Sequence, residues 1–465
     1  MADLQQSRTF KLKSVTFTDN KGNSKGIAGL VASFSYVESI VSPFVAGTLV
    51  LTDSAGFFNA VAISGGETVS IVLTDVISNV REDEDRTYNL VVWKVANRIV
   101  SDKAQIYTLG LISQEALINE GTRVAQPLKG KPEAIIANTL LKENIKTEKE
   151  FFSDPSQFEV NLLPNRRRPF DIAAVLATKS VPQQQKWGSG SGGSAGQETP
   201  DVNGTAGYFF WESYRGYNFV SVDTLCKLDD KDRPAWGPYE EQVANSDDNA
   251  NRQLAVLDSK FSSEVNVMAN LRLGKYASLM VFFDPQSGQY DEYVYKLKDS
   301  YEKMEHLGSG GLDLIPATDI DLSEYPTRYL SMLLDHETWH SGASPGSPEA
   351  DAGSKAPAKY PDWQKYFASQ SIARFSTLKN QECTVVVPGN YKICAGDRID
   401  IRLKSKLPDS GRKIEPFDRE SSGVYLIREV THDYDLSVGN GKFQTTLRLC
   451  RDSYGLPDSK SKHGN

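Results

Sequence analysis

The stretch Gly396-Asp397-Arg398-Ile399-Asp400-Ile401-Arg402-Leu403 has a counterpart near the start of the chain, Gly66-Glu67-Thr68-Val69-Ser70-Ile71-Val72-Leu73. Each stretch begins with a glycine and an acidic residue, and aliphatic side chains then occupy alternate positions. Alternation with a period of two is typical of a β-strand that buries one face. The two stretches therefore predict two strands built on the same pattern.

The strands that follow keep the same order in both places. A strand that opens with tyrosine comes next (Tyr88-Asn89-Leu90 and Tyr425-Leu426-Ile427), and a closing strand comes after a hairpin (Tyr107-Thr108-Leu109-Gly110-Leu111 and Phe443-Gln444-Thr445-Thr446-Leu447). The second hairpin contains Asn440-Gly441, a dipeptide that favours a type I′ turn. Chance similarity between two simple meanders is the alternative, because strand patterns carry little information. We predict a duplicated antiparallel β-barrel, since three strands match in order.

Composition limits the function classes that fit the chain. Its 465 residues are 39% hydrophobic and include 20 Tyr and 20 Phe, enough for several packed cores. The formal net charge of −8 argues against a protein that coats nucleic acid. Four cysteines without a Cys-x-x-Cys pair argue against a disulfide scaffold and against a structural zinc site. The N-terminus lacks the apolar core of a signal peptide and no stretch approaches 18 apolar residues, so we expect folding in a reducing cytoplasm and no membrane insertion.

These patterns predict an α+β fold that is mostly β, with two similar antiparallel β-barrels and a mixed α/β region between them. The predicted parts are a first barrel, a middle region, a split second barrel and a disordered tail, at residues 1–113, 114–250 with 299–371, 251–298 with 372–453, and 454–465. Residues 188–207 and 341–358 are rich in small and polar residues, so we expect them to be flexible insertions in the middle region.

Helices and hairpins are expected at defined places between the barrels. Residues 132–146 and 169–179 each begin with proline and carry aliphatic side chains on one side, which predicts two helices. Residues 208–223 and 278–297 are predicted hairpins. Residues 362–374 have apolar side chains at helical spacing and predict a third helix.

One stretch, His336-Glu337-Thr338-Trp339-His340, fits the His-Glu-x-x-His zinc motif. On a helix this spacing turns both imidazoles toward one Zn²⁺, and the glutamate serves as general base. A Ser/Gly/Pro-rich stretch follows at once, so His340 would lie at the fraying end of a helix, and no third ligand is evident. A zinc hydrolase is therefore the minor alternative, and a solvated helix end before a loop is the favoured interpretation.

Other motifs indicate no chemistry. Residues 342–346 fit Gly-x-Ser-x-Gly but lack the strand and helix that a nucleophile elbow joins. The basic cluster Asn165-Arg166-Arg167-Arg168-Pro169 could bind phosphate or an acidic partner, and a solvated loop is the alternative. The run Arg81-Glu82-Asp83-Glu84-Asp85-Arg86 is interpreted as a solubilising hairpin tip. No residue is predicted to be catalytic, to bind a cofactor or to ligate a metal.

Four stretches resemble the baseplate hub proteins of contractile-tailed bacteriophages, whose fold also forms the N-terminal part of type VI secretion spike proteins. The resemblance is one of pattern and spans nearly the whole chain. The stretches are Tyr107-Thr108-Leu109-Gly110-Leu111-Ile112-Ser113 followed by Lys129-Gly130-Lys131, the helix start Pro169-Phe170-Asp171-Ile172, the strand Tyr208-Phe209-Phe210-Trp211-Glu212, and the closing barrel from Val387 to Leu447.

The resemblance implies a structural, non-enzymatic homotrimer in which two barrels per chain form a ring of six elements. Such a ring adapts a six-fold tail tube to a three-fold spike and encloses a channel that DNA crosses in transit; an acidic lumen would let the polyanion slide. The implied partners are further copies of the chain, the spike, the tail tube or tube-initiator protein, the tape-measure protein and neighbouring baseplate wedge proteins. The expected location is the virion baseplate, after assembly in the host cytoplasm. A hub of a related secretion or extracellular injection machine is the alternative.

Overall fold

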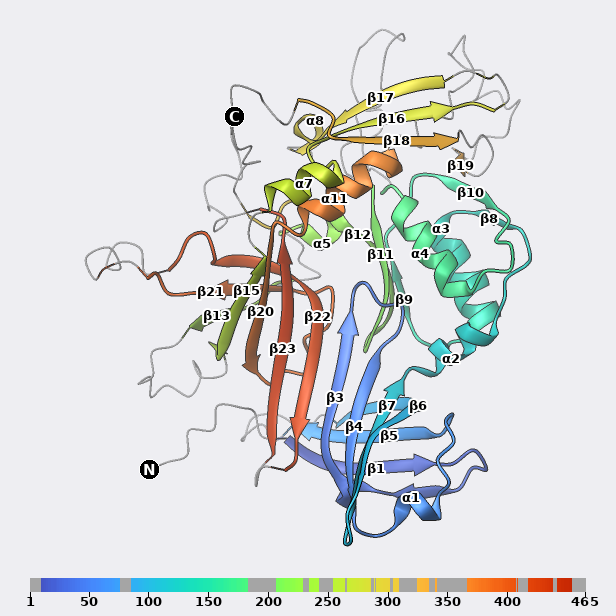
Figure 1. The fold of residues 1–465 in the computed structure, drawn as a ribbon, viewed down its shortest axis with the longest axis vertical. Helices are drawn as coiled ribbons and strands as arrows, with labels where there is room; N and C mark the ends of the chain where they lie inside the picture. The colour runs from blue at the N-terminus through green and yellow to red at the C-terminus, as the bar shows by residue number, and fades with distance from the viewer. Residues whose placement is uncertain are drawn as a thin grey trace.

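The chain was analysed as a computed structural model. It describes residues 10–75, 85–182, 206–228, 234–241, 254–263, 266–285, 288, 290–301, 304–308, 324–333, 339–340, 366–406, 408, 417–437 and 441–453. Strands make up most of the regular structure, and a few short helices gather between and above them (Figure 1). The predicted class, α+β and mostly β, is confirmed. In the described residues, no helix has the length and apolar character needed to cross a membrane.

One sheet of fourteen strands holds both copies of the sequence pattern. The N-terminal unit contributes seven strands: β1 (Phe10–Thr18), β2 (Ser24–Gly26), β3 (Val31–Ser39), β4 (Ala46–Asp53), β5 (Thr68–Asp75), β6 (Asp85–Val100) and β7 (Gln105–Ile112). The C-terminal unit contributes the others: β13 (Trp236–Glu241), β14 (Ala255–Val256), β15 (Asp258–Ser263), β20 (Gln381–Pro388), β21 (Arg398–Arg402), β22 (Gly423–Asp435) and β23 (Lys442–Arg451).

Each unit has an apolar core of its own, because the alternating residues of its strands point to one side. Val69, Ile71 and Leu73 lie in the N-terminal core, and Ile399 and Ile401 occupy the matching places in the C-terminal core. In the described part of the chain, the strand pairings join the two units into one sheet.

The duplication extends to individual backbone hydrogen bonds. Gly66 and Gly396 both adopt a left-handed backbone conformation, with φ of 93° and 90°. In each unit the amide of the glycine donates to the carbonyl of one residue on the next strand. The amide of that strand residue donates in turn to the carbonyl of the acidic residue that follows the glycine. The donor–acceptor pairs are Gly66–Val92 and Val92–Glu67 in the first unit, and Gly396–Ile427 and Ile427–Asp397 in the second, all at 2.8 to 2.9 Å.

The predicted register between the two copies is wrong by two residues. Val69 pairs with Leu90, whereas the equivalent Ile399 pairs with Tyr425, so Tyr425 corresponds to Leu90 and not to Tyr88. The closing strands are displaced in the same way. Side chains alternate with a period of two, so a shift of two residues keeps the same face buried and leaves the hydrophobic pattern unchanged.

The middle region carries the predicted helices and the first hairpin. Helix α4 (Pro169–Lys179) has the predicted bounds, and α3 (Pro132–Ala134) continues as the π-helix η2 (Ile135–Ile145). Strands β11 (Tyr208–Ser213) and β12 (Gly216–Ser221) form the aromatic hairpin. The remaining elements here are α2 (Gln114–Gly121), β8 (Leu128–Gly130), β9 (Phe151–Ser153), β10 (Glu159–Leu162) and α5 (Val222–Cys226).

The second predicted hairpin, β16 (Ala277–Phe283) and β17 (Tyr290–Lys296), pairs with β18 (Arg328–Leu333) in a separate three-stranded sheet. It shares no pairing with the C-terminal unit, the predicted place of residues 251–298. From that range β15 pairs with the unit, and β13, from the range predicted for the middle region, pairs with it too. Helices α7 (Val267–Leu273), α8 (Leu297–Tyr301), η3 (Tyr366–Gln370) and α11 (Ser371–Thr377) lie beside this sheet (Figure 1). The predicted insertion at 341–358, residues 188–205 of the other insertion and the tail lie outside the described residues.

Candidate functional site

The two units meet edge to edge, at a place that we call the inter-unit joint: strands β3 and β22, with the β11–β12 turn and residues 394–397 beside them. The two strands pair antiparallel over seven residue pairs, from Ser33–Asp435 to Ser39–Glu429. Phe34 stacks on Tyr434 with ring centroids 5.8 Å apart. The joint therefore continues both the backbone ladder and the apolar core from one unit into the other.

A buried carboxylate fixes the joint to its neighbours. The side chain of Glu38 is fully buried and accepts hydrogen bonds from the Tyr214 amide at 2.7 Å and from the Ala395 amide at 3.0 Å. Burial raises the pKa of Glu38, although these two amide hydrogen bonds oppose that shift. One side chain thus holds together β3, the β11–β12 turn and the segment before Gly396.

A second buried carboxylate ties the N-terminal unit to the middle region. Glu212 accepts a hydrogen bond from the Val45 amide at 3.0 Å, and Lys149 Nζ lies 2.5 Å from Glu212 and 2.7 Å from Glu115. Burial raises the pKa of Glu212. The pKa of Lys149 is also raised, because the two carboxylates outweigh the opposing effect of burial.

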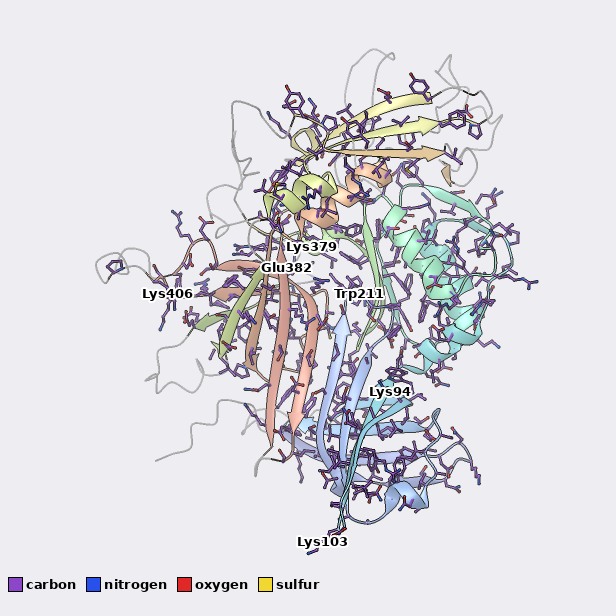
Figure 2. All side chains as sticks on the ribbon, viewed as in Figure 1. Lys94, Lys103, Trp211, Lys379, Glu382 and Lys406 are labelled. Atoms are coloured by element: carbon purple, nitrogen blue, oxygen red, sulfur yellow. The ribbon has the colours of Figure 1, made fainter. Side chains whose placement is uncertain are left out.

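The repeated Gly-acid turn of the C-terminal unit is the contact point for the aromatic hairpin. Trp211 lies between the C-terminal strands and the middle region (Figure 2), and its indole Nε1 donates to the Ala395 carbonyl at 3.1 Å. Arg215 contacts both carboxylate oxygens of Asp397, at 2.7 and 2.9 Å. A Cβ atom on Gly396 would come within 2.5 Å of the Trp211 ring, so this position requires glycine for space as well as for its φ.

Another buried ionic cluster joins the end of β23 to the helices. Arg374 on α11 is fully buried and contacts Asp452 at 2.9 Å and Asp223 at 3.1 Å. His306 Nδ1 lies 2.7 Å from Asp452. Burial alone would raise the pKa of Asp452, but the His306 hydrogen bond and the Arg374 charge outweigh it and hold that pKa well below its usual range.

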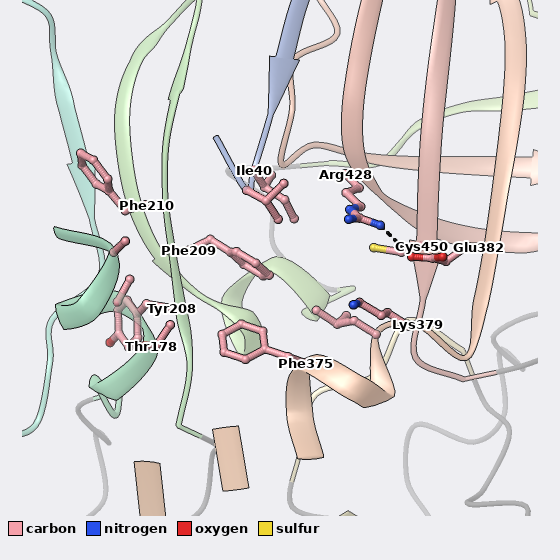
Figure 3. Close-up of a pocket in the computed structure, with 14 residues that line it drawn as sticks. Ile40, Thr178, Tyr208, Phe209, Phe210, Phe375, Lys379, Glu382, Arg428 and Cys450 are labelled. Carbon is pink, nitrogen blue, oxygen red and sulfur yellow. Dashed lines mark hydrogen bonds and ion pairs between the residues drawn. The ribbon is translucent and has the colours of Figure 1, made fainter. Parts of the chain in front are cut away.

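A cavity of about 330 Å³ lies where these regions meet (Figure 3). Ile40, Phe209 and Phe375 form apolar walls, and an Arg428–Glu382 ion pair at 2.8 Å lies at its side. Burial raises the pKa of the Cys450 thiol, which also lines the cavity, to about 12. A thiol with so high a pKa is a poor nucleophile at neutral pH.

The zinc motif does not end in the helix that it requires. Trp339–His340 form strand β19, in which His340 pairs with Glu159 and Trp339 with Val160. On a strand, two residues four apart lie about 13 Å from each other, too far for both imidazoles to reach one Zn²⁺. The strand therefore does not provide the helical geometry at this end of the motif. His336 and Glu337 lie outside the described residues, as do residues 342–346. Over the described ranges, no three His, Cys, Asp or Glu side chains gather as metal ligands would.

The two charged clusters predicted from the sequence lie in different environments. Arg168 contacts Glu120 at 2.5 Å and Asp171 at 3.1 Å, so the charge of this arginine in the basic cluster is already paired at a surface loop. Arg86, which we had assigned to a solvated charge run, is buried instead, and its guanidinium lies 3.4 Å from the Tyr214 ring centroid. Sequence reasoning missed Glu38, Arg86 and Arg374, because a charged residue in a strand or helix gives no local signal that it will be buried.

The fold and the joint define a class of protein: two β units of the same construction, joined edge to edge within one chain and flanked by an α/β region. No protein-family model matches the chain, and no curated protein matches it in sequence.

The fold of this chain is similar to that of several solved structures. The tail protein from Neisseria meningitidis MC58 is similar over 97% of this chain and 100% of its own, with a TM-score of 0.51 and 10% identity. The 43 kDa tail protein of prophage MuSo2 from Shewanella oneidensis is similar over 95% of this chain and 98% of its own, with a TM-score of 0.46 and 10% identity. At this identity the first likeness shows the fold alone, and for the fold it confirms the resemblance predicted from the sequence.

Proposed function

We propose that this chain is a structural subunit of a phage tail baseplate, a hub that forms a homotrimeric ring between a six-fold tail tube and a three-fold spike. The observation that carries the proposal is the duplicated unit: the same Gly-acid turn, the same reciprocal hydrogen bonds and the same strand order occur twice. Two equivalent units per chain let three chains present six similar surfaces at one end while keeping three-fold symmetry at the other.

The buried charges suit a part that must hold its shape. Glu38, Glu212 and Arg374 each connect segments that are far apart in the sequence, and each is held by hydrogen bonds or ion pairs. An unpaired buried charge is costly, so these contacts resist rearrangement of the units. A rigid ring fits an adaptor that supports a tube, a spike and wedge proteins around a channel for DNA and the tape-measure protein.

The mass of the full chain in solution tests the proposal. Light scattering coupled to size exclusion, alone and with the cognate spike, is expected to give three copies of the 51.4 kDa chain in the assembled state. A hub that stayed monomeric with its spike, or formed a ring with another copy number, would contradict the proposal. The proposed location is the virion baseplate, reached after assembly in the host cytoplasm, and antibody labelling of purified tails would locate the protein there.

A further inference from the structure

The inter-unit joint has two halves, and each half has a counterpart elsewhere in the chain. In the C-terminal unit, residues 429–435 of β22 lie beyond a bulge that follows Ile427, and they pair with β3. In the N-terminal unit, β6 has the same bulge after Val92 and a second bulge between Ala96 and Ile99 that β22 lacks. Residues 94–96 and 99–100 of β6 are therefore the counterparts of that part of β22. Strand β3 therefore covers this edge of β22, and the equivalent edge belongs to β6.

Strand β15 is the counterpart of β3. Strand β4 lies between β7 and β3, and the equivalent β20 lies between β23 and β15. In the described part of the chain, β15 pairs with β20 alone and β6 pairs with β5 only as far as Val91. Over the described ranges, each counterpart thus presents the edge that forms the joint with no strand paired to it.

The open part of β6 carries exposed apolar side chains together with the exposed Lys94, Asn97 and Arg98. Trp93 is 54% exposed, Ile99 65% and Val100 63%. All three belong to β6, whose hairpin with β7 carries the labelled Lys94 and Lys103 (Figure 2). An exposed apolar edge strand attracts another strand, and proteins normally cover such an edge or place charges on it. Arg98 is held by Gln105 and by the Phe58 ring of its own unit, and Ile99 and Val100 remain exposed beside it, which favours a partner strand at this edge.

We propose that residues 94–100 of β6 pair antiparallel with β15 of a second copy of this chain, as β22 pairs with β3 within one chain. The inference rests on the proposed ring and assigns the strands that close it. Each contact would be heterologous, with β6 of one copy on β15 of the next, and such contacts form a ring when the rotation closes.

The strand order supports closure by rotation. From β15 to β6 the sheet runs β15-β20-β23-β22-β3-β4-β7-β6, and each neighbouring pair is antiparallel. Because this path holds an even number of strands, its first and last strands run in opposite directions. A copy rotated about an axis along the strands then offers β15 antiparallel to β6, which is the direction that the joint uses.

The joint also fixes the register. Ile99 of β6 occupies the position that Asp433 has in β22. Lys260 of β15 occupies the position that Ser35 has in β3. The supporting pairs are Ile99–Ile106 beside Asp433–Gln444, and Lys260–Thr384 beside Ser35–Thr48. Within the joint, Ser35 Oγ lies 2.5 Å from Asp433 Oδ1, so side chains at this position touch. Ile99 of one copy is therefore expected opposite Lys260 of the next.

Cysteine cross-linking tests the pairing. Ile99→Cys and Lys260→Cys are placed on separate, differently tagged full chains that are co-expressed. Directly paired strands bring Cα atoms to about 4.5–5.5 Å, within disulfide range. Mild oxidation is expected to link the two tagged forms, and a chain with both changes is expected to link into trimers. The natural cysteines described in the structure are all buried, so the unmodified chain gives the background.

The matched control moves one cysteine by one residue. Ser259→Cys with Ile99→Cys places the two thiols on opposite faces of the sheet, because successive side chains alternate. This pair is expected to link much more weakly than Ile99→Cys with Lys260→Cys. Equal linking by the two pairs would overturn the proposed register.

A charge test does not depend on oxidation. Ile99→Lys places a second cation opposite Lys260 and is expected to weaken each contact by up to about fivefold, whereas adding Lys260→Glu to the same chain is expected to restore assembly. Ile99 is exposed, so these changes should leave the single chain folded. Ring assembly unaffected by Ile99→Lys would overturn the pairing.

The outcomes separate this inference from the proposed function. A trimer that neither cross-links at Ile99 and Lys260 nor responds to the charge changes would overturn the strand pairing and leave the ring proposal standing. A chain that stays monomeric in every variant, with and without the spike, would overturn both.

Discussion

Buried charged side chains hold segments from distant parts of the chain together. Arg374 connects α11 to the end of β23 and to α5, and Glu38 connects three segments at the inter-unit joint. Removing one partner of a buried, hydrogen-bonded pair leaves the other charge uncompensated. Single substitutions at these positions should therefore destabilise the chain more than changes to the surface ion pairs.

Asp452→Asn tests the strongest of these clusters. We expect the free energy of unfolding to fall by about 3–5 kcal/mol, because Arg374 loses its fully buried charged partner. Urea denaturation measures the change. Lys13→Met is the matched control, since Lys13 pairs with Asp85 at an exposed site and should leave stability nearly unchanged. Equal effects of the two variants would contradict the role assigned to the cluster.

The carboxylate of Asp452 also predicts how the stability of the chain changes as the pH falls. The pKa of Asp452 is lowered in the folded chain, so its contribution to stability is fully present above the unfolded value, about 3.9, and is lost as the pH falls through the lower folded value. Unfolding midpoints measured from pH 6 to pH 2 should fall more steeply for the unmodified chain than for Asp452→Asn. Parallel curves would contradict the assignment.

The duplicated glycines offer a paired test. Alanine at Gly66 or Gly396 forces a residue with a Cβ into a left-handed conformation, which costs about 1–3 kcal/mol. Gly396→Ala should cost more than Gly66→Ala, because its Cβ would meet the Trp211 ring at 2.5 Å while the Cβ at Gly66 would be 3.3 Å from the Asn20 side chain. Denaturation of the two variants gives the comparison, and a larger loss at Gly66 would contradict it.

At the scale of elements, local patterns predicted strands and helices but not their partners. Alternation predicted β5 and β21, and the leading proline predicted the start of α4. The partner of β21 on its other edge is β13, which runs parallel to it from a distant part of the chain. A period of two indicates which face of a strand is buried and does not indicate which strand lies beside it. Strand β13 was therefore placed in the middle region and not in the C-terminal unit.

The candidate site was largely beyond sequence reasoning. The turn glycines at Gly66 and Gly396 were visible because both copies could be compared, whereas Glu38 and Arg86 carry no pattern that separates them from solvated charges. Their burial depends on contacts with Tyr214, which only the folded chain brings near.

The strand conformation of β19 leads to a prediction about zinc binding at residues 336–340. Because Trp339–His340 pair with β10 as a strand, we expect the His-Glu-x-x-His stretch not to bind zinc. Elemental analysis of the purified full chain should find no stoichiometric zinc, and Glu337→Gln should leave the thermal unfolding midpoint unchanged in the presence of added zinc. One zinc per chain that Glu337→Gln or His340→Ala removes would contradict this prediction.

At the scale of the whole molecule, one chain contains two similar units and one joint between them. One path through the sheet runs from β15 to the open part of β6, and a single copy leaves both of these edges without a paired strand in the described part of the chain. Three copies would place each end beside its counterpart, and the net charge of −8 suits a channel that repels DNA. The duplicated unit thus accounts for both the architecture and the proposed assembly.

Cryo-electron microscopy of the assembled protein, alone or with its spike, tests this central claim most directly. The proposal predicts a ring of three copies in which six similar β units alternate around the channel, with β6 of each copy beside β15 of the next. A ring with another number of copies, or an assembly in which the two units of each chain occupy unrelated positions, would contradict it.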